Sequence, residues 1–148
     1  MKSYQDKSKS ELIKEIESLK KQVRDFSEFK DNNMQFKKIV DSTSAHMSFI
    51  NKDYIYQEVN KSCCKANKKK REQIVGHSIA ELLGSEVFEN LIKEKIDRCF
   101  SGESVRYESW FDFAGIGRRY MDVSYHPYFD KEKQISGVIV WSIYFSFL

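Results

Sequence analysis

Residues 62–71 read SCCKANKKKR, which places two adjacent thiols directly before a run of positive charge. Cysteine thiolates bind metal ions or exchange disulfides, and clustered Lys and Arg side chains bind phosphate groups. Zinc sites, however, use Cys pairs that are separated by about two to four residues. Cys63 and Cys64 are neighbours, so on a helix their side chains would point about 100° apart. We therefore expect one buried and one partly exposed thiol, and we expect Cys99, on an apolar helix stripe, to belong to the core.

The basic run predicts a solvated surface and no binding of nucleic acid. The chain of 148 residues carries 25 Lys and Arg against 22 Asp and Glu, a net charge of +3. Proteins that bind nucleic acid typically carry a much stronger basic patch. Acidic side chains follow the run closely in the sequence, and we expect them to balance it: Glu81, Glu86, Glu89, Glu94 and Asp97.

Other residues that could support catalysis or metal binding lack the required spacing. The histidines His46, His77 and His126 share no ligand pattern, so we expect no metal site. The chain has no glycine-rich phosphate loop and no motif for a Ser-His-Asp triad. Asp112 and Asp122 face each other across a predicted hairpin, but on its expected solvent side. We therefore predict a protein without catalytic residues, which is not an enzyme.

The composition predicts one folded domain with an accessory helix. Hydrophobic residues make up 41% of the chain and include 11 Phe, 8 Tyr and 2 Trp, enough for a substantial core. Three cysteines do not form a disulfide framework, which favours reduced thiols and a cytoplasmic location. The N-terminus lacks the apolar core of a signal peptide, and no apolar run is long enough for a membrane span.

Residues 10–30 are predicted to form an amphipathic helix with a coiled-coil seam. Ser8 and Glu11 match a capping box at its start. The seam residues recur at alternating intervals of four and three: Leu12, Ile16, Leu19, Val23 and Phe26. Such a short seam has little to bury alone. We therefore expect residues 1–35 to be a dimerisation segment that makes the chain a homodimer, with packing back onto its own domain as the alternative.

The remaining pattern predicts an α+β domain over residues 36–148. Phe29, Phe36, Ile39 and Val40 form a second helical stripe, which turn-forming residues end at 41–44. Further helices are predicted at 61–70, 72–83 and 85–100, and strands at 46–50, 54–60, 104–113, 118–129 and 134–147. This order indicates one five-stranded antiparallel sheet with helices on one face.

Three segments of this domain carry patterns that recur together in one known family. The first segment is the hairpin SFINKDYIYQEVN, which ends on Asn60. The second is QIVGHSIAELLG, with Gly76, Ser78, Glu81 and Leu82, and the third is the closing pair of strands, with Pro127, Asp130, Gly137 and Val138. In this order and spacing the three segments resemble the PAS (sensory box) family, the sensory modules of bacterial and eukaryotic signalling proteins such as two-component systems, which commonly carry these residues at the corresponding places.

The chain departs from the family after its last strand. The family often shows Asp-Ile-Thr there, a link to an output helix, where this chain has Tyr144-Phe145-Ser146 and ends at Leu148. We therefore expect no kinase, cyclase or DNA-binding module in this chain, and the output is left open.

The resemblance implies an interior cavity that the sheet and the middle helices enclose. The residues expected to face inward as candidate ligand contacts are Phe49, Tyr107, Phe111, Met121, Val123, Tyr125, Val140 and Ser142. Tyr107, Tyr125 and Ser142 would supply polar groups for a small-molecule ligand. A packed core without a ligand is the alternative.

No cofactor is expected from the family's known signatures. Its haem-binding members carry their axial His on the long helix, and SEVFENLIKEKIDRCF contains none. Its light-sensing flavin members carry Gly-x-Asn-Cys-Arg-Phe-Leu-Gln, which is absent. The resemblance thus implies a cytoplasmic sensor that binds a small ligand or partner and signals through its dimeric helix. A protein-interaction module with a filled core is the alternative, and a haem or flavin redox sensor is the second alternative.

Overall fold

The computed structural model describes residues 6–145 of the chain, which divides after Ile39 into two compact units. Within residues 6–145, no helix combines the length and the apolar composition that a membrane span requires. The helices and strands follow in this order: α1 (Lys9–Ser42), β1 (His46–Asn51), β2 (Tyr56–Val59), α2 (Lys61–Asn67), α3 (Arg71–Ile74), α4 (Ile79–Leu83), α5 (Ser85–Val87), the π-helix η2 (Phe88–Ile92), α6 (Lys93–Phe100), β3 (Val105–Phe113), β4 (Gly117–Phe129) and β5 (Ile135–Tyr144).

Helix α1 is one continuous helix of 34 residues, so the two predicted helical stripes belong to a single element. The predicted capping box starts it, because the Glu11 amide donates to Ser8 Oγ and the Ser8 amide donates to the Glu11 carboxylate, each over 3.2 Å. No residue of α1 is buried, and Phe26 on the seam is 67% exposed. The second compact unit begins at Val40, whereas the sequence predicted a boundary between residues 35 and 36.

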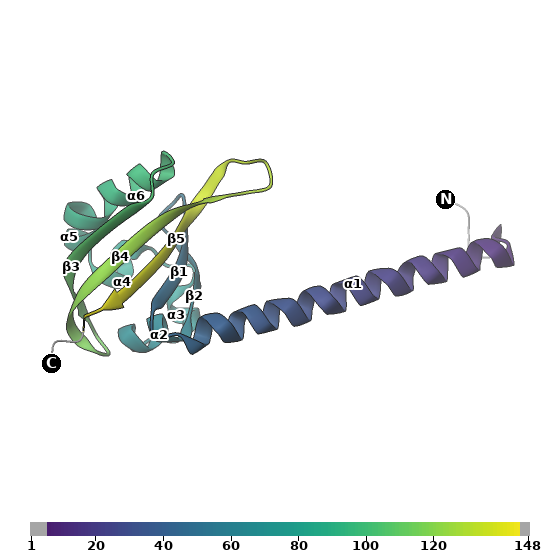
Figure 1. Ribbon diagram of the computed structural model, residues 1–148, viewed down its shortest axis with the longest axis horizontal. Helices are drawn as coiled ribbons and strands as arrows, with labels where there is room; N and C mark the ends of the chain where they lie inside the picture. The colour runs from purple at the N-terminus through teal and green to yellow at the C-terminus, as the bar shows by residue number, and fades with distance from the viewer. Residues whose placement is uncertain (1–5, 146–148) are drawn as a thin grey trace. The chain divides into compact units, whose positions relative to one another are not determined.

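The second unit contains one five-stranded sheet in the order β2-β1-β5-β4-β3, with every neighbouring pair antiparallel (Figure 1). This confirms the predicted α+β class. The continuously apolar β5 lies at the centre of the sheet, where both of its edges are paired. Its predicted end at residue 147 lies outside the described residues, within which β5 ends at Tyr144.

The hairpin between β1 and β2 is closed by a side chain. Asn51 Oδ1 accepts hydrogen bonds from the amides of Asp53 and Ile55, over 2.9 and 3.1 Å. An Asn side chain that bonds the backbone two residues later forms an Asx-turn, which explains why the sequence Asn51-Lys52-Asp53 favours a turn. Tyr54 completes the turn with a positive φ of 61°.

The segment from Gly76 to Leu83 shows what its sequence pattern does physically. Gly76 has a φ of +88°, a conformation that side chains with a Cβ rarely adopt. Ser78 is the N-cap of α4, and Glu81 completes its capping box by accepting from the Ser78 amide over 2.9 Å. The helix that starts there buries Ile79 at 1% exposure and packs Leu82 and Leu83 against the core.

The core lies between the helices and one face of the sheet, which we call the inner face. Side chains alternate along each strand, and the inner positions of β4 are Met121, Val123 and Tyr125, all at most 4% exposed. From the helices, Ile92 and Ile96 pack against them at no more than 2% exposure. Burying one such aliphatic side chain contributes roughly 1.5–3 kcal/mol of stability.

The helical segment from Ser85 to Phe100 is less regular than its sequence predicts. A π-helix interrupts it at Phe88–Ile92, and Gly84 occupies the N-cap position. Phe88 and Ile92, at the two ends of the π-helix, are both buried in the core, at 8% and 2% exposure.

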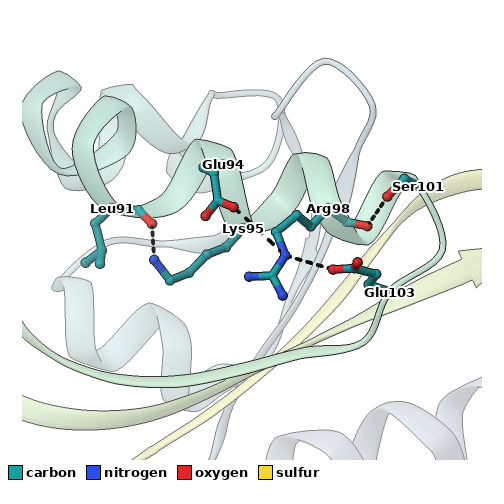
Figure 2. A network of polar contacts seen from close by, with 6 residues as sticks. All are labelled: Leu91, Glu94, Lys95, Arg98, Ser101 and Glu103. Carbon is teal, nitrogen blue, oxygen red and sulfur yellow. Dashed lines mark hydrogen bonds and ion pairs between the residues drawn. The ribbon is translucent and has the colours of Figure 1, made fainter.

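A polar network stabilises the outward side of α6 (Figure 2). Arg98 Nε donates to Glu103 over 2.7 Å and lies 3.9 Å from Glu94, one turn earlier on the same helix. Ser101 Oγ donates to the Arg98 carbonyl over 2.7 Å, which satisfies one of the unpaired acceptors at the helix end. These contacts hold in place the helix whose other side lines the interior.

Candidate functional site

The inner face of the sheet and the helices enclose a cavity of about 60 Å³. One enclosed water needs about 15 Å³ by a comparable measure, so the cavity has room for a compact group of several atoms. Its lining comes from every strand of the sheet and from α2, α4, η2 and α6: His46, Ser48, Ile50, Tyr56, Cys63, Asn67, Ile79, Leu82, Leu83, Ile92, Ile96, Phe111, Phe113, Met121, Val123, Tyr125, Val140 and Ser142.

Most of the candidate residues from the sequence meet at this cavity. They lie on the three long strands, whose alternation and pairing are regular enough to predict which positions share a face. The candidates that line the cavity are Phe111, Met121, Val123, Tyr125, Val140 and Ser142.

Phe49 is placed wrongly by the sequence prediction. Its neighbours Ser48 and Ile50 take the inner positions of β1, so alternation directs Phe49 to the opposite, outer face of the sheet. There its ring meets the edge of the Tyr128 ring at a centroid distance of 5.2 Å. Phe49 therefore does not contribute to the cavity.

Tyr107 is next to the cavity but does not line it. Its hydroxyl lies 2.6 Å from the Tyr125 hydroxyl, in a hydrogen bond that either oxygen can donate. Lys95 Nζ lies 4.8 Å from the centre of the Tyr107 ring. Burial raises the pKa of Tyr107 to about 12, so the hydroxyl stays protonated. The Tyr107 and Tyr125 hydroxyls satisfy each other.

Several polar cavity residues were not expected from the sequence. His46 and Ser48 of β1, Tyr56 of β2 and Asn67 of α2 all line the cavity. The alternating pattern of HMSFI contains the signal for the first two, because positions 46, 48 and 50 share one face. The prediction assigned that face to Phe49 instead.

Asn60 joins the cavity wall to the last turn of α1. This side chain is 2% exposed and makes four hydrogen bonds. Its Nδ2 donates to the carbonyls of Val40 and Ala45, each over 2.9 Å. Its Oδ1 accepts from the amides of Met47 and Cys63, over 3.0 and 3.1 Å. One buried amide thus connects the end of α1, the start of β1 and the N-terminus of α2, which it caps.

Two neighbouring residues extend this junction. The Lys61 amide donates to Asp41 Oδ1 over 2.8 Å, and Ser62 Oγ donates to the Thr43 carbonyl over 2.5 Å. His46, a cavity residue, lies between Ala45 and Met47, whose backbone groups bond the Asn60 side chain. The Asn60 hydrogen bonds thus lie directly beside a residue of the cavity lining.

The thiol pair in SCCKANKKKR has the expected placement. Cys63 is buried and lines the cavity, and Cys64 is partly exposed. Burial raises the pKa of Cys63 to about 12, so its thiol stays protonated and unreactive. At the end of the basic run, Arg71 forms two hydrogen bonds with the Glu58 carboxylate on β2, over 2.6 and 3.3 Å. Within residues 6–145, no three His, Cys, Asp or Glu side chains cluster as a metal site would require.

Asp112 and Asp122 are not a carboxylate pair. Asp112 lies opposite Arg118 in the β3–β4 ladder, whereas Asp122 lies opposite Glu108. Asp122 is only 3% exposed, and Arg106 donates to both of its oxygens, over 2.5 and 2.9 Å. The Arg106 guanidinium holds the pKa of Asp122 below its usual range. Asp122 and Arg106 thus form an ion pair on the outer face of the sheet.

Comparisons with known proteins agree with this architecture. A family model described as the PAS fold matches residues 40–143. A search of curated proteins finds no match. The PAS domain of a protein from Colwellia psychrerythraea is 13% identical with a TM-score of 0.64, over 76% of this chain and 95% of that one.

Two further solved structures have the same fold. VqmA of Vibrio cholerae, solved bound to DPO, is 10% identical with a TM-score of 0.67, and the match covers 76% of this chain but only 57% of that one. The PAS domain of nitrogen regulation protein NR(II) from Vibrio parahaemolyticus is 13% identical with a TM-score of 0.57, over 74% of this chain and 96% of that one. With the family model spanning residues 40–143 and the matching sheet and helices, this chain belongs to the PAS-fold family.

Proposed function

We propose that this protein is a sensory module that binds a small ligand in its cavity and transmits the occupancy to α1. The observation that carries the proposal is the buried Asn60, whose side chain bonds the end of α1, the start of β1 and the N-terminus of α2. Ligand contact at His46 then acts on the two backbone groups that flank it. VqmA, a structural neighbour, is solved with DPO bound.

Helix α1 is proposed to pair with α1 of a second copy. Its apolar seam is exposed from Ile16 onward, with Ile16 at 51% and Val23 at 68%. An exposed helix with such a seam is stabilised when a second helix covers it. A ligand that favours one arrangement of the junction would shift the population of helix-pair states in proportion to its difference in affinity for the two. VqmA has also been solved as a dimer.

The proposed module acts without catalysis, in the cytoplasm, and without haem or flavin. The cavity volume of about 60 Å³ supports the last point, because pockets for drug-sized ligands typically measure about 300–1,000 Å³. A haem or flavin would require the helices to move away from the sheet.

A second candidate function has its own observation in support. The outer face of the sheet exposes large apolar side chains, among them Trp110 at 48%, Tyr128 at 45% and Ile139 at 37%. Large exposed apolar patches on a protein surface are typical of sites that contact other proteins. In this alternative the protein is an interaction module and the cavity is a packing void.

Native mass spectrometry of the full chain tests the proposal. The expected spectrum is that of a dimer in which each protomer carries a bound small molecule. The Leu19→Asp variant should be a monomer, because it places a charge in the seam, whereas the matched control Ser18→Asp, on the outward side of the helix, should remain a dimer. Burial of Leu19 in both copies is worth roughly 3–6 kcal/mol, so the dimer dissociation constant should rise at least about 100-fold. A dimer without any bound molecule would favour the interaction module, and an unaffected Leu19→Asp dimer would exclude the seam.

A further inference from the structure

Several polar side chains line the cavity without a hydrogen bond to the described residues. They carry the His46 ring nitrogens and the hydroxyls of Ser48, Tyr56 and Ser142. His46 is 7% exposed, Tyr56 5% and Ser142 8%. Within residues 6–145, every fully enclosed side-chain nitrogen or oxygen has a hydrogen-bond partner, so these cavity-lining atoms are accessible, and a molecule inside the cavity can bond them.

Three of these polar groups, those of His46, Ser48 and Ser142, come from the paired strands β1 and β5 and form the polar edge of the cavity. His46 lies directly opposite Ser142 in the β1–β5 ladder, and Ser48 occupies the next inner position of β1. Side chains opposite each other in a ladder have Cβ atoms about 4.5–5.5 Å apart, so one ligand group can reach both. The His46 imidazole offers one donor and one acceptor, and a serine hydroxyl offers both.

The lining has no formal charge to receive a charged ligand. Among the residues that the structure describes, it includes no Asp, Glu, Lys or Arg side chain. Burial lowers the pKa of His46, which keeps the imidazole neutral at neutral pH, and burial raises the pKa of Tyr56, which keeps its hydroxyl protonated. Moving an unpaired charge into such surroundings costs several kcal/mol, whereas a neutral polar group needs only its hydrogen bonds.

The rest of the lining is apolar and would enclose the body of the ligand. Ile79, Leu82 and Ile92 come from the helices, and Phe111 and Met121 come from the sheet. The side chains of Met121, Leu82 and Leu83 can change rotamer to fit the shape of a bound ligand. The Tyr107–Tyr125 hydroxyl pair is already satisfied and is not needed for recognition.

We propose that the cavity selects an uncharged, compact, largely apolar molecule whose hydroxyl, carbonyl or ring N–H group is bound by His46 and Ser142. This inference rests on the proposed function and adds the ligand class to it. Ser48, on β1, belongs to the same polar edge. The Tyr56 hydroxyl, on β2, offers the ligand a separate hydrogen-bonding group.

Ligand-observed NMR by saturation transfer on the full chain tests this with three probes that share one ring. The probes are cyclopentanol, cyclopentylammonium and cyclopentanecarboxylate. Cyclopentanol should bind and the two charged probes should not. Loss of one hydrogen bond should weaken cyclopentanol binding about three- to tenfold in His46→Phe and in Ser142→Ala. His126→Phe, an exposed histidine on β4 outside the cavity lining, is the matched control and should bind as the wild type does.

Each outcome decides a different part of the inference. Equal or stronger binding of a charged probe would overturn the ligand class while leaving the cavity as a ligand site. Unchanged cyclopentanol affinity in both cavity variants, with native circular dichroism, would overturn the roles of His46 and Ser142. No binding of any probe would overturn this inference, and the native mass spectrum of the wild type would then decide separately whether the proposed function fails with it.

Discussion

The replacement Asn60→Asp tests how much the junction depends on one side chain. The two side chains have nearly the same shape, so packing is retained. The carboxylate can still accept from the amides of Met47 and Cys63. It cannot donate, so the carbonyls of Val40 and Ala45 lose their bonds of 2.9 Å. A buried polar group left without its partner costs about 1–3 kcal/mol, which gives a loss of about 2–6 kcal/mol for the pair.

The same variant should show a characteristic pH dependence. The carboxylate faces two carbonyl oxygens in a site where Asn60 is 2% exposed, which raises its pKa in the folded state above the unfolded value. Because the folded-state pKa is raised, the protonated side chain restores stability at pH values below the unfolded-state pKa. This stability is lost as the pH rises through the folded-state pKa. The difference in unfolding free energy between wild type and variant should therefore grow from pH 4 to pH 7.

Urea denaturation followed by circular dichroism measures both effects. The matched control is Asn51→Asp, because the Asn51 side chain accepts two turn hydrogen bonds and a carboxylate accepts them equally well. We expect the control to change stability by less than about 0.5 kcal/mol. A loss at Asn60 no larger than that of the control, or one independent of pH, would refute the role given to the Asn60 amide.

Three further predictions follow from other contacts. Arg106→Ala should lower stability by about 1–3 kcal/mol at pH 7, because it leaves the Asp122 carboxylate buried and unpaired. The ion pair lowers the folded-state pKa of Asp122, so its contribution to stability is present above the unfolded-state pKa and is lost as the pH falls. The melting temperatures of wild type and variant should therefore converge in acid, and a difference between them that stays constant with pH would contradict this. Iodoacetamide at pH 8 should label Cys64 well before Cys63, whose pKa burial raises to about 12, and peptide mapping that finds equal rates would contradict the burial. Gly137→Ala would place a Cβ 2.5 Å from a backbone oxygen of β1 and should cost about 1–3 kcal/mol in urea unfolding, an expectation that an unchanged midpoint would refute.

The parts of the fold that depend on local chemistry could be predicted from the sequence. The capping box of Ser8 and Glu11 joins residues three apart, and the regular alternation of β3 and β4 predicts which side chains face inward. The continuity of α1 was missed because Lys30 and Asn33 end the apolar seam. They do not end the helix, since Lys is a good helix former and no Pro or Gly follows before Ser42.

The parts that depend on partners distant in sequence could not be predicted. The inner face of β1 is decided by its ladder with β5, where His46 meets Ser142, and short strands carry too few residues to reveal their orientation. The burial of Asp122 follows from Arg106, 16 residues earlier on the neighbouring strand. Asn60 was recognised as a family position, but its bond to Val40 spans 20 residues and appears only in the folded chain.

Hydrogen exchange of the full chain, with and without saturating cyclopentanol, measures whether the cavity and the end of α1 are coupled through Asn60. If they are coupled, we expect slower exchange of the backbone amides in residues 37–47, together with those that line the cavity, when the probe is bound. Protection that is confined to the cavity strands, with unchanged exchange in residues 37–45 at full occupancy, would contradict it.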